Sequence, residues 1–143
     1  MNQNYDQLAD LIAQDKFSWE RDTINAMLYT GLEFDGADKT VADLDGGFRS
    51  LQRIDGRFVS DRAAYGLPVA YSRAEGGIQY QIVLAQDTGL NNPNLIAFID
   101  VNADDSPLQV QHTGTMIVRP VLPEEEIPGH TGSNVGVWMR LPI

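Results

Sequence analysis

Apolar and polar residues alternate along several short stretches of this chain, and a period of two is typical of β-strands with one buried face. The clearest alternation runs from Ile78 to Leu84, and a second runs from Ile24 to Tyr29 and ends at Gly31. Residues 95–101 are apolar on both faces, as in a strand covered from both sides. We therefore predict a central strand at 78–84 and a doubly covered strand at 95–101.

Shorter strand-like segments fill most of the remaining chain, separated by Gly and Pro turn signals. Pro68 favours a strand start or a sheet edge, because proline cannot donate to a β-ladder. Together these patterns predict a mainly β fold: an antiparallel β-sandwich, or a partly closed jelly-roll-like barrel, of about seven or eight strands with a short N-terminal helix. The additional predicted strands are 57–60, 67–71, 108–111, 115–121 and 135–141.

Helical spacing occurs at the N-terminus, where apolar residues three and four positions apart predict one face of a helix within 4–16. These residues are Tyr5, Leu8, Leu11 and Ile12. A single helical turn is predicted from Thr40 to Leu44, where Thr40 can cap the free amides and Asp43 can reach back. The rest of 31–50 reads as a long loop.

The 143 residues fit a single domain, made of an N-terminal helix or docking segment (1–16) and a β domain (17–143) with an acidic loop at 122–133. No apolar stretch approaches the roughly 20 residues that cross a bilayer. The first residues are acidic and lack the basic and apolar regions of a secretory signal. We expect no membrane partner and synthesis in a cytoplasm.

The formal charge of −10 opposes binding to phosphate backbones, so nucleic acid is not an expected partner. The absence of cysteine excludes disulfides, thiolate nucleophiles and Cys-type zinc sites. Stability must therefore come from packing, to which assembly could add.

Oxygen ligands at alternate positions, Asp100, Asn102 and Asp104, resemble the first half of an EF-hand calcium loop. The second half does not fit, because Asp105 stands where the loop needs Gly and Gln111 stands where it needs Glu. An Asx-rich turn after a strand is the favoured interpretation, with these three residues as a weak calcium candidate. No metal and no cofactor are predicted.

Catalytic patterns are equally weak. Ser133 lies three residues from His130 in a Gly-rich loop, and together they form the only local pairing of a candidate nucleophile with a candidate base. Closeness in a flexible loop does not preorganise the two side chains for catalysis. We expect no enzyme activity and no catalytic residues. A carbohydrate-binding module is an alternative, and it would need an exposed aromatic face formed by residues such as Tyr65, Tyr71 and Tyr80.

Four sequence blocks form a recognisable pattern: Trp19-x-x-Asp22-Thr23-Ile24, Thr40-x-Ala42-Asp43-Leu44, Ile82 to Gly89 ending in Asp-Thr-Gly, and Leu95-Ile96-Ala97-Phe98-Ile99-Asp100. This pattern resembles a widespread group of small structural proteins of tailed bacteriophages. In that group, the residue at the position of Phe98 is usually Tyr, and the resemblance extends from Phe17 to Arg119.

The resemblance implies a virion component without catalytic residues, most simply a decoration or cement protein on the outer surface of the assembled head. Its partners would be the major capsid protein and copies of itself, in a homo-oligomer such as a trimer, with affinity from many repeated contacts. A tail, neck or baseplate component is the alternative within virions. Residues expected to meet partners are the helix face Tyr5, Leu8, Leu11 and Ile12, and Trp138 in the last strand, which a neighbouring subunit could cover.

Overall fold

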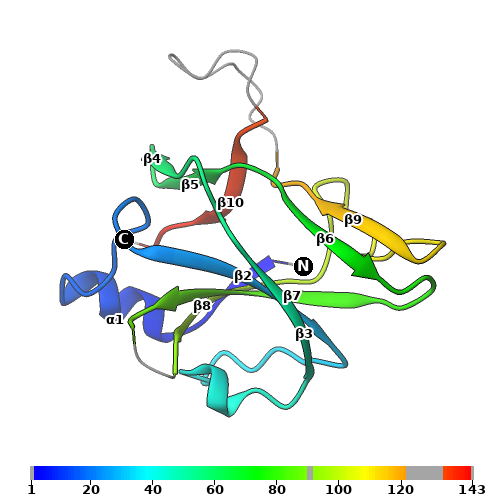
Figure 1. Cartoon of the computed structure of the whole chain (residues 1–143). Helices are drawn as coiled ribbons and strands as arrows, with labels where there is room; N and C mark the ends of the chain where they lie inside the picture. Colours follow the sequence, from blue (N-terminus) through cyan, green and yellow to red (C-terminus); the bar gives the residue numbers. More distant parts are fainter. Residues whose placement is uncertain (1, 90–91, 122–133, 143) are drawn as a thin grey trace.

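The computed structural model describes residues 2–89, 92–121 and 134–142, and in these residues the chain is mainly β (Figure 1). A five-stranded antiparallel sheet has the strand order β1-β8-β7-β2-β3. Its strands are β1 (Asn2–Asn4), β8 (Asn94–Ile99), β7 (Tyr80–Asp87), β2 (Thr23–Thr30) and β3 (Gly47–Arg53).

Two smaller antiparallel sheets complete the fold. One has the order β10-β5-β4, and the other pairs β6 with β9. Their strands are β10 (Gly136–Arg140), β5 (Ala63–Gly66), β4 (Phe58–Ser60), β6 (Val69–Ala74) and β9 (Gly114–Val118).

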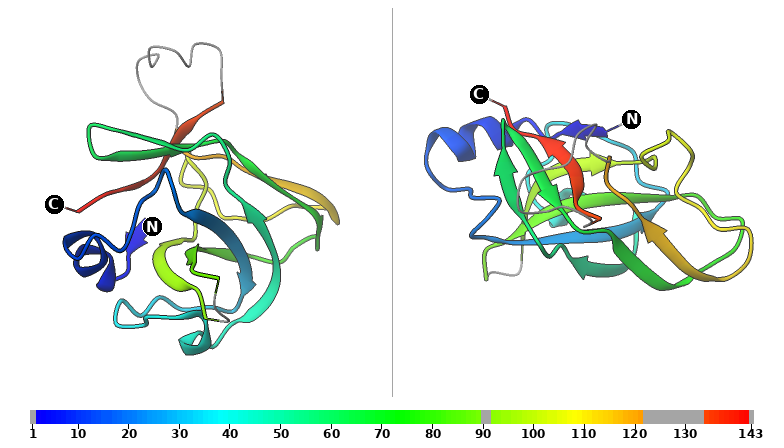
Figure 2. Two further views of the ribbon diagram at one scale, coloured as in Figure 1. Left: turned by 60° about the vertical axis from the view of Figure 1, so that its left-hand side comes forward. Right: turned by 90° about the horizontal axis from the view of Figure 1, so that it is seen from above.

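The main core lies between the five-stranded sheet and the two smaller sheets, which form the opposing layer (Figures 1 and 2). Its largest fully buried side chains include Trp19, Tyr71 and Tyr80. The predicted antiparallel sandwich with one short helix is confirmed, and the barrel alternative is not, since the sheets remain separate. The described residues form ten strands, more than the seven or eight predicted.

A second apolar cluster covers the other face of the five-stranded sheet. Segment 31–46 contributes Leu32 and Phe34, which pack with Tyr5 against Val83 and Phe98 of the sheet. Strands β7 and β8 are therefore buried on both faces, as the doubly apolar pattern of 95–101 predicted. The prediction of a long loop over 31–50 is corrected, because 47–53 forms β3 and the preceding segment is a covering layer.

The helix α1 (Gln7–Ala13) is shorter than the predicted 4–16. It begins late because residues 2–4 form β1, which pairs with β8. The predicted turn near Thr40 is present as the 3₁₀ helix η1 (Val41–Asp43). No helix in the described ranges is long and apolar enough to span a bilayer.

Two other strand predictions need adjustment, and one predicted loop cannot be compared with the structure. Residues 108–111 form no strand and make isolated bridges, Leu108 with Tyr80 and Val110 with Gly76. The segment predicted at 67–71 begins one residue after Pro68, in agreement with the missing proline donor. The predicted acidic loop 122–133, with His130 and Ser133, lies outside the described residues.

Candidate partner-docking site

The segment between α1 and β2 is fixed by hydrogen bonds to distant parts of the chain. The indole N–H of Trp19 donates to the carbonyl of Tyr65 at 2.8 Å. The Arg57 guanidinium donates to the carbonyls of Trp19 and Asp22, and burial lowers the pKa of Arg57 from its ordinary value. The backbone N–H of Ser18 donates to the Asp22 carboxylate at 2.7 Å. This segment is therefore hydrogen-bonded to β5 and to the residue that precedes β4.

Gln86 links that segment to two central strands. It is 4% exposed, and its amide donates to the Lys16 carbonyl at 2.8 Å and to the Asp22 carboxylate at 2.7 Å. Its side-chain oxygen accepts a hydrogen bond from Asn94 at 3.0 Å. Burial of a polar side chain is tolerated here because each of its groups has a partner.

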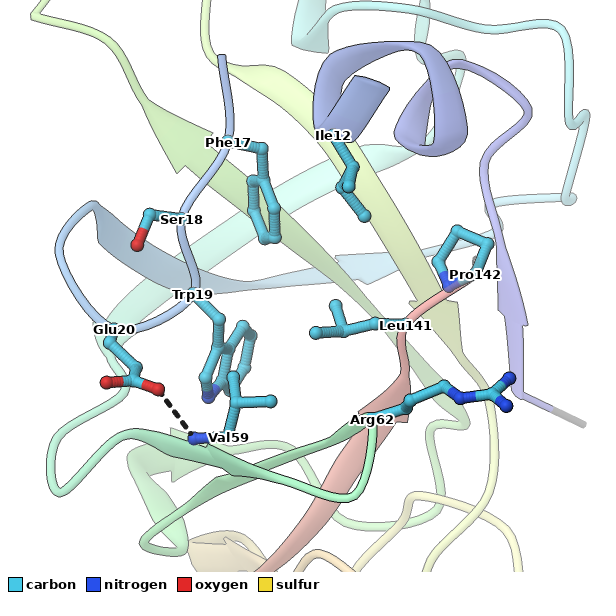
Figure 3. Close-up of a pocket in the computed structure, with 9 residues that line it drawn as sticks. All are labelled: Ile12, Phe17, Ser18, Trp19, Glu20, Val59, Arg62, Leu141 and Pro142. Atoms are coloured by element: carbon cyan, nitrogen blue, oxygen red, sulfur yellow. Dashed lines mark hydrogen bonds between the residues drawn. The ribbon is translucent and has the colours of Figure 1, made fainter. Parts of the chain in front are cut away.

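An apolar pocket of about 330 Å³ opens beside this segment (Figure 3). Phe17 and Trp19 are buried, whereas Ile12, Val59 and Leu141 are partly exposed. The pocket thus collects side chains from α1, from the segment before β2, from β4 and from the residues after β10. Its lining residues are Ile12, Phe17, Ser18, Trp19, Glu20, Val59, Arg62, Leu141 and Pro142.

One acidic and one basic side chain lie on opposite sides of the apolar walls, Glu20 and Arg62 (Figure 3). Glu20 accepts a hydrogen bond from the backbone N–H of Val59 at 3.1 Å, which fixes that wall to β4. The carbonyl of Arg62 accepts from the N–H of Leu141 at 2.8 Å, which fixes the C-terminal wall. An apolar group with charged or polar flanks would match this arrangement.

The residues predicted to meet partners differ in their exposure to solvent. Tyr5, Leu8 and Trp138 are 1%, 0% and 3% exposed, and they stabilise this chain from within. The Trp138 indole N–H donates to the Leu67 carbonyl at 3.2 Å. The helix face therefore does not present Tyr5 and Leu8 to a partner. Leu11 and Ile12 remain partly exposed, and Ile12 lines the pocket.

Sequence reasoning did not find Phe17, Val59 and Leu141 as pocket residues. They lie far apart in the chain and come together only after β4 and β10 join the same sheet. Their apolar character was the only available signal, and it does not distinguish a pocket wall from a core residue.

The weak calcium candidate forms a hydrogen-bonded turn. The Asn102 amide donates to the Ser106 hydroxyl at 3.2 Å and to the Pro107 carbonyl at 3.0 Å. Asp104 accepts from the backbone N–H of Ser106 at 3.1 Å, and the bonds from Ser106 lower the pKa of Asp104. Over the described ranges, no group of three or more His, Cys, Asp or Glu is placed to hold a metal ion. Asp100, the first residue of the calcium candidate, therefore belongs to no such group.

The three tyrosines of the carbohydrate-binding alternative do not share an exposed face. The Tyr71 hydroxyl donates to the Ala26 carbonyl at 2.6 Å from within the core. Tyr80 is 1% exposed, and its hydroxyl accepts from the N–H of Glu75 at 2.7 Å. Tyr65 stacks against Phe58 with ring centroids 4.8 Å apart. Tyr71 and Tyr80 are thus not available to stack against a sugar.

An open hollow of about 800 Å³ in segment 31–45 is strongly acidic, and we term it the acidic hollow. Burial, and then repulsion from Asp35, Asp43 and Asp45, raise the pKa of Asp38. Hydrogen bonds from Lys39 and Thr40 lower the pKa of Asp43. The acidic residues lining the hollow are Glu33, Asp35, Asp38, Asp43 and Asp45.

Comparison of the chain with protein-family models, with curated proteins and with solved structures finds no match.

Proposed function

We propose that this chain is a structural protein of a tailed-bacteriophage particle and that it decorates the outer surface of the assembled capsid. The observation that carries the proposal is the set of four sequence blocks similar to small phage structural proteins. The fold adds a physical reason for those blocks to occur together, because their residues contact one another.

The contacts among the blocks are specific. Asp22 of the first block and Gln86 of the third share a hydrogen bond, and Asn94, next to the fourth block, also bonds to Gln86. Thr40 of the second block forms a β-bridge with Asn94, and the N–H of Leu95 donates to the Lys39 carbonyl. The four blocks therefore lie together in one hydrogen-bonded framework of the fold.

The apolar pocket supports a docking role for the region around α1. Its partly exposed walls would accept an apolar side chain of the capsid protein, with Glu20 and Arg62 available for polar contacts at the margin. Single contacts of this size give modest affinity, and a lattice of identical sites would multiply it.

The first experiment is quantitative mass spectrometry of separated heads and tails from purified particles. Hundreds of copies on heads are expected from a lattice of decoration sites. A few dozen copies or fewer on tails would overturn capsid decoration and favour a tail, neck or baseplate component. Absence from the particles would overturn the virion assignment itself.

The docking pocket is tested with Ile12→Gln, which keeps a similar volume and places an amide in the apolar wall. We expect lower capsid occupancy with a nearly unchanged melting temperature, because Ile12 is only partly buried. The control is Ala13→Gln, an exposed position next to Ile12 in α1 that does not line the pocket. Equal occupancy for both variants would exclude the pocket from docking.

A further inference from the structure

Strand β3 is an edge of the five-stranded sheet, and it is exposed on both faces. Six of its seven residues are exposed, and the remaining one, Ser50, is intermediate. Phe48 is 50% exposed and Leu51 is 45% exposed, which are high values for apolar side chains in a sheet. In the described ranges, β3 forms a ladder with β2 and no other strand. Such an edge offers unpaired backbone groups to another chain.

Two other sheet edges are occupied by side-chain contacts. The Glu20 carboxylate accepts the N–H of Val59 in edge strand β4. At the opposite end of the large sheet, β1 lies close to β10, and the Asn4 amide donates to the Arg140 carbonyl at 2.8 Å. Proteins protect edges in this way against unwanted pairing. Strand β3 also lies close to β6, and the exposed Arg49–Glu75 ion pair joins the two regions. Among the described residues no ladder forms between β3 and β6, so the outer backbone edge of β3 has no strand paired with it.

The charge of β3 is opposite to that of the whole molecule. Its two ionisable residues, Arg49 and Arg53, are both basic in a chain of net charge −10. Arg49 forms an ion pair with Glu75 at 3.1 Å, and Arg53 lies 3.4 Å from Asp55. Both ion pairs are solvent-exposed, so they are weak and can exchange for a new partner.

The residues of β3 lie on both sides of the strand. Leu51 pairs with Met27, a residue of the second apolar cluster, and Arg53 pairs with Asn25 on the same face of the sheet. Both β3 side chains remain exposed on that face. Arg49 forms its ion pair with Glu75, the residue after β6. Strand β6 belongs to the opposing layer (Figure 1). A segment paired with this edge would therefore meet one arginine on each side and apolar contacts on one.

We propose that the outer edge of β3 binds an extended acidic segment of a partner protein as an additional antiparallel or parallel strand. Backbone hydrogen bonds to the β3 edge supply affinity, Phe48 and Leu51 cover apolar side chains of the segment, and Arg49 and Arg53 select negative charge. This inference goes beyond the proposed function, because it concerns a different surface and does not require a capsid partner.

The test uses the full ¹⁵N-labelled chain and a capped peptide of about eight residues, a common strand length, that alternates Glu and Val. We expect the amide signals of Gly47–Arg53 to shift on titration and their hydrogen exchange to slow. A peptide alternating Lys and Val is the matched control and should bind at least about tenfold more weakly. Absence of shifts up to about 1 mM peptide, or equal binding of the two peptides, would overturn the proposal.

Charge reversal separates recognition from folding. The double variant Arg49→Glu and Arg53→Glu should no longer bind the Glu–Val peptide and should bind the Lys–Val peptide instead. A misfolded chain would not show this reversal of affinity. Arg119→Glu, at an exposed residue after β9, should leave both affinities unchanged. Concentration-dependent broadening of the β3 signals without peptide, together with a dimer in sedimentation, would instead identify a second copy as the occupant and overturn the acidic-segment proposal.

Discussion

The carboxylate of Asp43 closes the turn η1 by accepting the backbone N–H groups of Lys39 at 2.9 Å and Thr40 at 3.1 Å. These bonds favour the ionised form and lower the pKa of Asp43 below its usual 3.8. The stabilisation is therefore fully present above pH 3.8 and is lost as the pH falls through the lowered pKa.

We predict that Asp43→Asn lowers the melting temperature at neutral pH. The difference in melting temperature from the wild type should disappear as the pH falls below the lowered pKa of Asp43. Asp45→Asn is the control, because it removes the same charge from the acidic hollow without removing the cap. Thermal denaturation followed by circular dichroism between pH 2 and 7 measures both variants, a range set by the usual carboxylate pKa values. Equal effects of the two substitutions would contradict a specific role for the cap.

Individual residues differ in how far the sequence reveals their role. The Thr40–Asp43 cap could be predicted because its partners are three positions apart. The partners of Gln86 are Lys16, Asp22 and Asn94, and only the folded chain brings them together. For the same reason, burial of Tyr5 beneath segment 31–46 could not be read from its helical spacing.

At the scale of elements, strands with a local signal were predictable and strands without one were not. The alternation at 24–29 and 78–84 corresponds to β2 and β7. Strand β3 was missed because both of its faces are exposed, which removes the alternation. Strand β5 was missed because it is built from Ala63, Ala64, Tyr65 and Gly66, small residues apart from the tyrosine, and long-range packing determines its place.

Gly66 in β5 provides an element-scale prediction. A Cβ at this position would lie 2.6 Å from the Ile54 side chain and 3.0 Å from the Trp138 ring. We predict that Gly66→Ala destabilises the fold by about 1–3 kcal/mol, because the core must shift to accept the methyl group. Gly114→Ala in β9 is the control, since the nearest atom there is 3.9 Å away. Urea denaturation of both variants tests this, and equal stability would contradict the packing at β5.

The whole molecule combines two apolar clusters, one on each face of the large sheet, with a surface of net charge −10. Composition predicts the charge, and binary pattern predicts the sandwich. The pocket and the acidic hollow were not predictable as units, because the pocket forms from four segments and the hollow depends on how segment 31–45 folds over the sheet.

The pKa of Asp38, in the acidic hollow, is raised by burial and by the negative charges around it. The ionised form of Asp38 therefore opposes folding above its unfolded pKa of 3.8, and this cost disappears at lower pH. We predict that Asp38→Asn raises the melting temperature at neutral pH and low salt, with a smaller gain at about 0.15 M salt, where repulsion is screened beyond roughly 8 Å. Asp61→Asn, in the turn after β4, removes the same net charge away from the hollow and should give a smaller gain. Equal gains would mean that the total charge, and not its concentration in segment 31–45, limits the stability of the free chain.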